Sequence, residues 1–182
     1  CKYMAIAGQS LWGGYWADAP DSTLNYLAPP WPNNVTSSTG SGSSATIAHT
    51  TAGTNRLLVV GVTTSGAAGT NPSGVTYNSV GMTNAGTTDD GAGTGVSLWY
   101  LVAPATGAHN VVVTFSGSPS YTVGIESFTG VHQSTPVGGS TSASGTSTTP
   151  SVAVTSAAGD RVVDSLALKT TTAPTVGAGQ TQ

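Results

Sequence analysis

The sequence predicts an all-β protein: a jelly-roll or immunoglobulin-like antiparallel β-sandwich that carries an extended N-terminal arm. Short runs rich in Val, Ile and Thr recur at close spacing with turn residues between them, which is typical of sandwiches and barrels. Residues 1–32 show no helical period of apolar residues. With 182 residues, the chain is long enough to bury the core of one domain and to carry an arm as well.

Charge is scarce in this sequence, which narrows the function classes. Charged residues make up 6% of the chain and the net charge is -3, whereas an ordinary globular protein has about 25% charged residues. Without a basic patch we expect no nucleic-acid partner. So few charges serve cytosolic solubility poorly, so we expect an extracellular, cell-surface location. No apolar run approaches the roughly 18 residues that a membrane-spanning helix needs.

The best-specified stretch is residues 95–117, which read as two strands joined by a turn. In an extended chain the first strand has two largely apolar faces. One face holds Val96, Leu98, Tyr100 and Val102, and the other holds Ser97, Trp99 and Leu101. Pro104 and Gly107 interrupt the run before β-branched residues resume at 109–115. This pattern predicts a hairpin in the middle of the sandwich.

Further strands are expected on both sides of that hairpin. Residues 56–63 (RLLVVGVT) are almost continuously apolar, which predicts a central strand covered on both faces. Residues 65–73 and 84–94 are expected to be loops, and residues 135–149 an edge strand or loop. The other expected strands are residues 45–50, 75–77, 80–83, 121–129, 151–155 and 161–168.

The first 32 residues differ from the rest, because they hold half of the twelve aromatic residues. Such a segment needs a surface against which to bury its rings. Within residues 1–32, an extended arm, two pieces (2–7 and 23–27) are expected to form strands, and the arm ends in a Pro-rich spacer. Residues 33–44 are expected to form a Gly/Ser hinge, and residues 45–182 the sandwich domain.

Four motifs carry a resemblance to a known family. They are NRLLVVGV at 55–62, SLWYLVAPATG at 97–107, NVVVTFSG at 110–117 and SFTGVHQSTP at 127–136. Together they resemble a recurring bacterial extracellular jelly-roll-like module of large secreted and surface-anchored proteins. The resemblance covers about residues 43–182 and implies a sandwich and an extracellular setting, without a defined activity.

The resemblance also implies a displaced closing segment. In such modules, GAGQTQ at 177–182 would be followed by a loop and a closing strand. Residues 2–28 resemble that continuation, with STLNYL at 22–27 as the final strand. The closing segment would therefore have moved to the front of the chain.

No pattern in the sequence spells out a reaction, so we expect neither an enzyme nor a cofactor. His49, His109 and His132 lie on different expected elements, and no nucleophile motif accompanies them. Asp89 and Asp90 are calcium candidates, and a solvated turn is the alternative.

Glu126 is the sole glutamate of the chain and shares a strand face with Phe128, so we expect it to be half-buried. A buried acid needs a cationic partner. The candidates are Arg56, Arg161 and Lys169.

Two positions are candidates for modification. Cys1 is the sole cysteine and a candidate for lipidation, which would be the protein's one route to a membrane. Asn34 begins the glycosylation sequon Asn-Val-Thr, expected here in an exposed hinge; a bare polar loop is the alternative.

The leading functional hypothesis is a structural protein: a subunit of a pilus- or fibre-like extracellular filament that self-assembles by donor-strand exchange. The arm would complete the sandwich of a neighbouring copy, because an extended segment satisfies an unpaired sheet edge. The expected interface residues are Tyr3, Met4, Ala5, Ile6, Leu11, Trp12, Tyr15, Trp16, Leu24, Tyr26 and Leu27.

The alternative is a monomeric carbohydrate-binding or adhesion module whose arm folds onto its own domain. Its partners would be surface glycans, stacked on a platform of Trp12, Tyr15 and Trp16.

Overall fold

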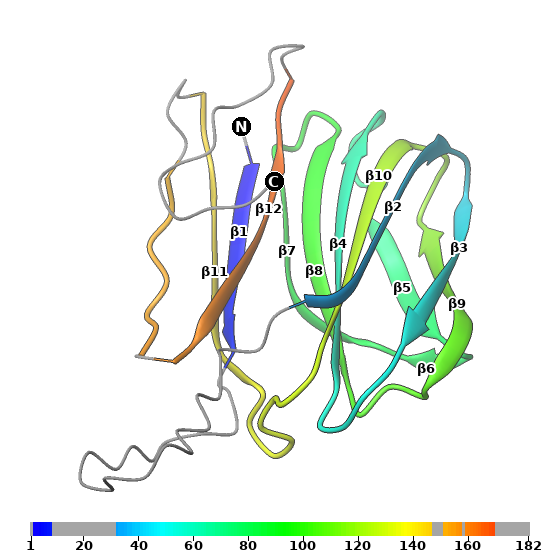
Figure 1. Cartoon of the computed structure of the whole chain (residues 1–182). Helices are drawn as coiled ribbons and strands as arrows, with labels where there is room; N and C mark the ends of the chain where they lie inside the picture. Colours follow the sequence, from blue (N-terminus) through cyan, green and yellow to red (C-terminus); the bar gives the residue numbers. More distant parts are fainter. Residues whose placement is uncertain (1, 9–31, 147–150, 158, 170–182) are drawn as a thin grey trace, which may run out of the picture.

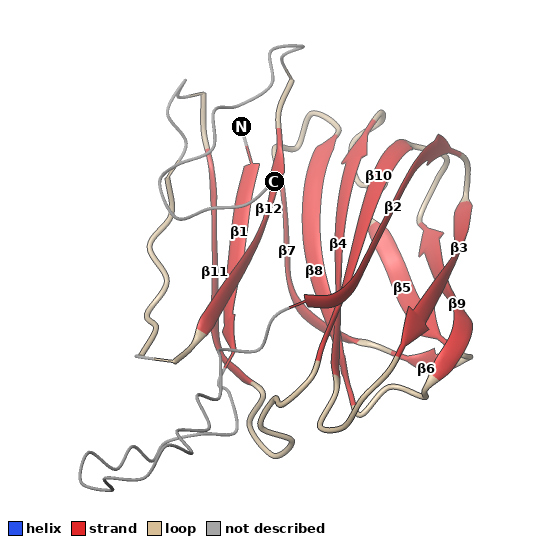
Figure 2. Cartoon of the chain, viewed as in Figure 1, coloured by secondary structure: helices blue, strands red, loops and turns tan. Residues whose placement is uncertain are grey.

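The computed structural model describes residues 2–8, 32–146, 151–157 and 159–169. These residues contain no helix, and their strands confirm the predicted all-β class (Figure 2). The strands are β1 (Lys2–Gly8), β2 (Pro32–Ser41), β3 (Ser44–Thr51), β4 (Leu57–Ser65), β5 (Pro72–Tyr77), β6 (Val80–Gly81), β7 (Thr83–Asp89), β8 (Thr94–Val102), β9 (Gly107–Phe115), β10 (Ser120–Phe128), β11 (Val137–Ser144) and β12 (Arg161–Ala167).

The strands form a sandwich with an additional layer (Figure 1). A five-stranded sheet in the order β2-β10-β4-β8-β7 packs on a four-stranded sheet in the order β3-β9-β5-β6. A three-stranded sheet in the order β11-β1-β12, called the third sheet below, covers part of the other face of the five-stranded sheet. Every strand pair is antiparallel.

The central sheet is buried on both faces, as the apolar run at residues 56–63 predicts. On β4, Leu58 and Val60 are fully buried in the sandwich core, while Val59 is buried in a second cluster under the third sheet. The predicted two faces of β8 are confirmed as well. Trp99 belongs to the sandwich core and Leu98 to the second cluster.

The prediction of a hairpin at residues 95–117 is wrong. β8 pairs with β4 and β7 in one sheet, and β9 pairs with β3 and β5 in the other. The chain crosses between the layers at Ala103, whose φ is positive at 50°. Arg56 holds this crossing, because its Nε donates a hydrogen bond of 2.8 Å to the carbonyl of Pro104.

Three other segments differ from expectation. Residues 33–41, expected in a hinge, belong to β2, and residues 84–89, expected in a loop, belong to β7. Both strands lie at the edges of the five-stranded sheet, where a polar sequence is compatible with a strand. Residues 151–155 form no strand. The strands expected at residues 75–77 and 80–83 contribute to β5 and β6, which pair as a hairpin, and the turn residues Asn78 and Ser79 both have positive φ.

Candidate functional site

The most unusual feature of the fold is the position of β1. It lies between β11 and β12, with Ala5 opposite Thr141 on one side and opposite Asp164 on the other. Because β1 is antiparallel to both neighbours, β11 and β12 run parallel to each other, about 9.5 Å apart. We call the space between them the slot. The N-terminal strand therefore completes a sheet whose other two strands come from the C-terminal part of the chain (Figure 1).

Four of the expected interface residues, Tyr3, Met4, Ala5 and Ile6, belong to β1. The remaining seven lie outside the described residues, as does Cys1. They are Leu11, Trp12, Tyr15, Trp16, Leu24, Tyr26 and Leu27.

Both walls of the slot have their own contacts with the five-stranded sheet. On β11, the Ser140 hydroxyl donates a hydrogen bond of 2.7 Å to the carbonyl of Ala85, and Val137 packs against the second cluster. On β12, Ala167 is buried in that cluster and Val163 packs against it. The slot therefore has walls held by contacts that do not involve β1.

A turn around Asp90 ties down the end of β12. Lys169, just after β12, forms an ion pair of 3.1 Å with the Asp90 carboxylate. The backbone N–H groups of Thr94 and Ala92 donate hydrogen bonds to the same carboxylate, at 2.9 and 2.8 Å. These hydrogen bonds, that of Thr94 first, and the charge of Lys169 hold the pKa of Asp90 well below its usual range.

Asp89, the other calcium candidate, is engaged in a similar way. One oxygen accepts the backbone N–H of Gly91 at 2.9 Å and the other accepts the Asn71 amide at 2.7 Å. These contacts describe a turn capped by its own carboxylates. In the described part of the chain, no three His, Cys, Asp or Glu side chains gather in a metal-binding group. Calcium binding at Asp89 and Asp90 stays a prediction.

A groove of about 350 Å³ lies beside β12, between the third sheet and the five-stranded sheet. Its floor includes Gly61 of β4 and Gly124 of β10, which lie opposite each other in the sheet. A Cβ at Gly61 would lie 3.3 Å from the Ser165 hydroxyl of β12, whereas a Cβ at Gly124 would meet nothing within 4 Å. The glycine pair thus lets β12 approach closely on one side and leaves open space on the other.

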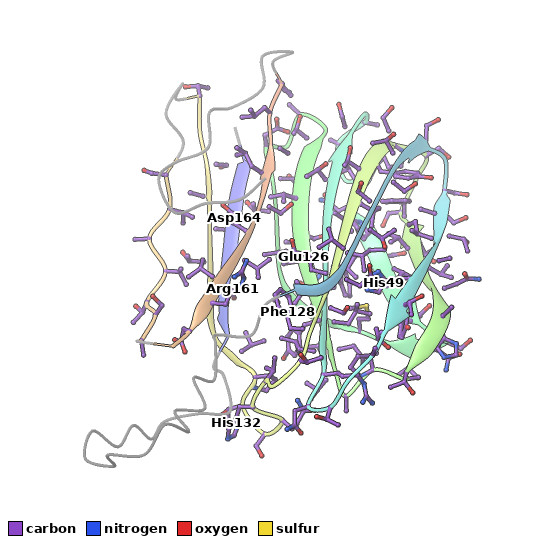
Figure 3. All side chains as sticks on the ribbon, in the orientation of Figure 1. His49, Glu126, Phe128, His132, Arg161 and Asp164 are labelled. Atoms are coloured by element: carbon purple, nitrogen blue, oxygen red, sulfur yellow. The ribbon has the colours of Figure 1, made fainter. Side chains whose placement is uncertain are left out.

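Glu126 lines this groove, and its pKa is raised from the usual value. Burial raises its pKa, the nearby Arg161 lowers it, and Asp164 raises it further. Figure 3 shows Glu126 on β10, with Arg161 and Asp164 on β12 of the adjacent layer. Glu126 is half-buried, as expected, and of the three candidate cations Arg161 is the one that acts on it electrostatically. The other candidates lie elsewhere, since Arg56 binds Pro104 and Lys169 binds Asp90.

The three histidines lie on separate elements, and His49 is the most buried of them. It is 2% exposed, and its Nδ1 lies 2.9 Å from the Thr36 hydroxyl, while its Nε2 is buried without a hydrogen-bond partner. Burial lowers the pKa of His49. His109 contacts the carbonyl of Thr106, and His132 accepts the backbone N–H of Thr135. Figure 3 shows His49 and His132 in different parts of the molecule.

The glycosylation sequon lies in a strand, where an exposed hinge was expected. Asn34 is part of β2, and its side-chain amide donates a hydrogen bond of 2.9 Å to the carbonyl of Thr50. The hydroxyl of Thr36, the third sequon residue, is 2.9 Å from His49. Both polar groups of the sequon therefore have partners within the fold, and glycosylation at Asn34 stays a prediction.

Comparisons with known proteins add no relative. No family model matches the chain, and no curated protein or solved structure is similar enough to count as a match. Among the described residues, no helix has the length and apolar character needed to cross a membrane.

Proposed function

We propose that this chain is a structural subunit of an extracellular filament that polymerises by donating its N-terminal strand into the slot of a neighbouring copy. The observation that carries the proposal is β1 itself, an N-terminal strand inserted between two C-terminal strands that run parallel to each other. Insertion of an extended segment between strands is a recurrent mode of protein association, because the backbone hydrogen bonds supply affinity whatever the source of the segment.

The length of the connection between β1 and β2 supports exchange between copies. Gly8 lies opposite Arg161, and Pro32 lies opposite Phe128. Arg161 in turn acts electrostatically on Glu126, two residues before Phe128, so β1 ends and β2 begins at the same end of the molecule (Figure 3). Residues 9–31 join these points and could span about 75 Å when extended. A connection of that length lets β1 reach the slot of its own chain or that of another.

Exchange preserves the contacts and changes only which chain supplies the strand. The slot of each copy would receive the β1 of the next, and each β1 would leave for another slot. Such a head-to-tail contact joins two different surfaces, so it generates an open filament unless the rotation between copies closes a ring. The walls of the slot support this step, because Ser140, Val163 and Ala167 hold them to the five-stranded sheet independently of β1.

A pair of engineered cysteines tests the proposal directly. Ala5→Cys and Asp164→Cys, combined in a Cys1→Ser background, place two thiols opposite each other in the register of β1 and β12. Strand donation predicts that oxidation of assembled protein produces a ladder of covalent oligomers on a non-reducing gel. A strand that stays in its own slot gives disulfide-bonded monomers instead.

A matched control uses Ala5→Cys with Thr46→Cys, since Thr46 is exposed on β3 of the four-stranded sheet. This pair is expected to give no ladder under the same oxidation. Negative-stain imaging and size-exclusion chromatography of the intact protein complete the test. A monodisperse monomer at high protein concentration, with all disulfides within one chain, would refute strand donation.

A further inference from the structure

We propose that the contact between β2 and β3, called the seam below, opens in acid because His49 takes up a proton. β2 and β3 follow each other in the chain and are edge strands of different sheets, so together they close one edge of the sandwich (Figure 1). The seam is a different surface from the slot, so this inference stands or falls separately from the filament.

Side chains join the two strands across the seam. The hydroxyl of Thr36 on β2 lies 2.9 Å from Nδ1 of His49 on β3. The Asn34 amide donates a hydrogen bond of 2.9 Å to the carbonyl of Thr50. In the described part of the chain, the regular ladders pair β2 with β10 and β3 with β9, not with each other. The seam therefore depends on side-chain contacts, and His49 supplies one of them.

The surroundings of His49 suit only a neutral imidazole. The side chain is almost fully buried, and its Nε2 has no hydrogen-bond partner among the described residues. A neutral imidazole donates from one nitrogen, whereas an imidazolium donates from both. The Thr36 hydroxyl can accept from Nδ1, but a proton on Nε2 would have no acceptor in the closed seam. Burial of such a charge is costly, and it lowers the pKa of His49.

Within the described residues, no carboxylate faces His49 to offset a positive charge. His109 lies directly opposite it in the register of β3 and β9, so the titratable group on β9 is a second imidazole. Tyr77 of β5 donates a hydrogen bond of 3.3 Å to the carbonyl of His49. Strands β2, β3, β4, β5, β8 and β9 contain no Asp or Glu. Glu126 of β10 lines the groove beside β12, and Asp89 of β7 lies at the far edge of the five-stranded sheet.

Acid therefore favours an open seam in which water reaches the imidazole. An exposed histidine has a pKa near 6.5. Between pH 7.5 and 5.0, proton uptake by the open form raises its population by up to about thirtyfold relative to a closed form that stays neutral. The seam would thus loosen one edge of the sandwich while the rest of the fold is kept.

Hydrogen exchange on the full chain at pH 7.5 and 5.0, expressed as protection factors, tests the inference. Division by the intrinsic exchange rate removes the direct effect of pH on exchange. We expect protection in residues 34–41 and 44–51 to fall by up to about thirtyfold at pH 5.0. Residues 83–89, at the opposite edge of the five-stranded sheet, are expected to keep their protection. Unchanged protection at the seam, or an equal loss in residues 83–89, would overturn the proposal.

Two matched variants assign the response to one imidazole. His49→Gln keeps a polar side chain that does not titrate, so its protection factors are expected to be the same at both pH values. His109→Gln removes the opposite imidazole and is expected to respond as the parent does. A response that persists in His49→Gln, or that is lost in both variants, would refute the role of His49.

An NMR titration of the imidazole signals of the parent gives the same answer if His49→Gln does not fold. We expect the His49 signal to shift over the pH range in which the seam loses protection. Loss of protection without a shift of that signal would also refute the proposal.

Discussion

The third sheet packs closely on the five-stranded sheet at Gly61 of β4. A Cβ there would lie 3.3 Å from the Ser165 hydroxyl and 3.5 Å from a methyl group of the fully buried Leu98. The branched side chain of Gly61→Val extends beyond its Cβ, so β12 or Leu98 must move. Overpacking of this kind costs about 1–3 kcal/mol, and it is offset by about 0.5–1 kcal/mol because a glycine is removed from a strand.

The matched control is Gly74→Val on β5 of the four-stranded sheet, where a Cβ would meet nothing within 4 Å. This variant gains the strand preference of valine without overpacking, so the preference cancels in the comparison. Gly61→Val is therefore expected to be less stable than Gly74→Val by about 1–3 kcal/mol. Urea unfolding measures this difference, and hydrogen exchange is expected to show the largest loosening in β12. Equal stability of the two variants would refute the close packing of β12 on β4.

The remaining predictions concern charged and titratable groups. Burial lowers the folded-state pKa of His49 from 6.5, so its contribution to the free energy of unfolding is fully present above pH 6.5 and is lost as the pH falls towards the folded-state pKa. Urea midpoints across pH 5–8 should show this loss in the parent and not in His49→Gln. Burial raises the folded-state pKa of Glu126 from 4.5, so its contribution to the free energy of unfolding is present below pH 4.5 and is lost as the pH rises through the folded-state pKa. The stability of Glu126→Gln relative to the parent should therefore be greater at pH 7.5 than at pH 4. The same stability difference between variant and parent at both pH values would contradict this. Asp90→Ala should lower the urea midpoint more than Lys169→Ala, because it also removes two hydrogen bonds to backbone N–H groups; a larger effect of Lys169→Ala would contradict the turn described here.

The third sheet gives the slot and the groove a common origin. β12 forms one wall of both, with β1 on one edge and the groove on the other. Its anchors, Ala167 in the second cluster and Lys169 at Asp90, therefore hold both sites in place. A change that loosens β12 should therefore weaken strand insertion and alter the groove as well, whereas a change confined to β11 should affect insertion alone.

Local patterning determined the strands and their faces in this protein. The two apolar faces of β8 and the buried run of β4 could be identified because side chains alternate across a strand with a period of two residues. The same rule predicted that Glu126 and Phe128 share a face. Because burial of a charged group is costly, that face also predicted a cationic partner for Glu126. The edge strands β2 and β7 could not be predicted in this way, because a polar edge strand and a loop have similar compositions.

Strand partners were decided only by the tertiary structure. Residues 94–102 and 107–115 look like a hairpin in the sequence, yet they belong to different sheets, because a short connection through Ala103 and Pro104 can cross between layers as readily as it can reverse within one. Likewise the sequence predicted a strand at residues 2–7 but could not place it between β11 and β12. Alternation reports which face of a strand is buried, whereas backbone hydrogen bonds are the same for every sequence, so the choice of neighbour depends on how all the layers pack together.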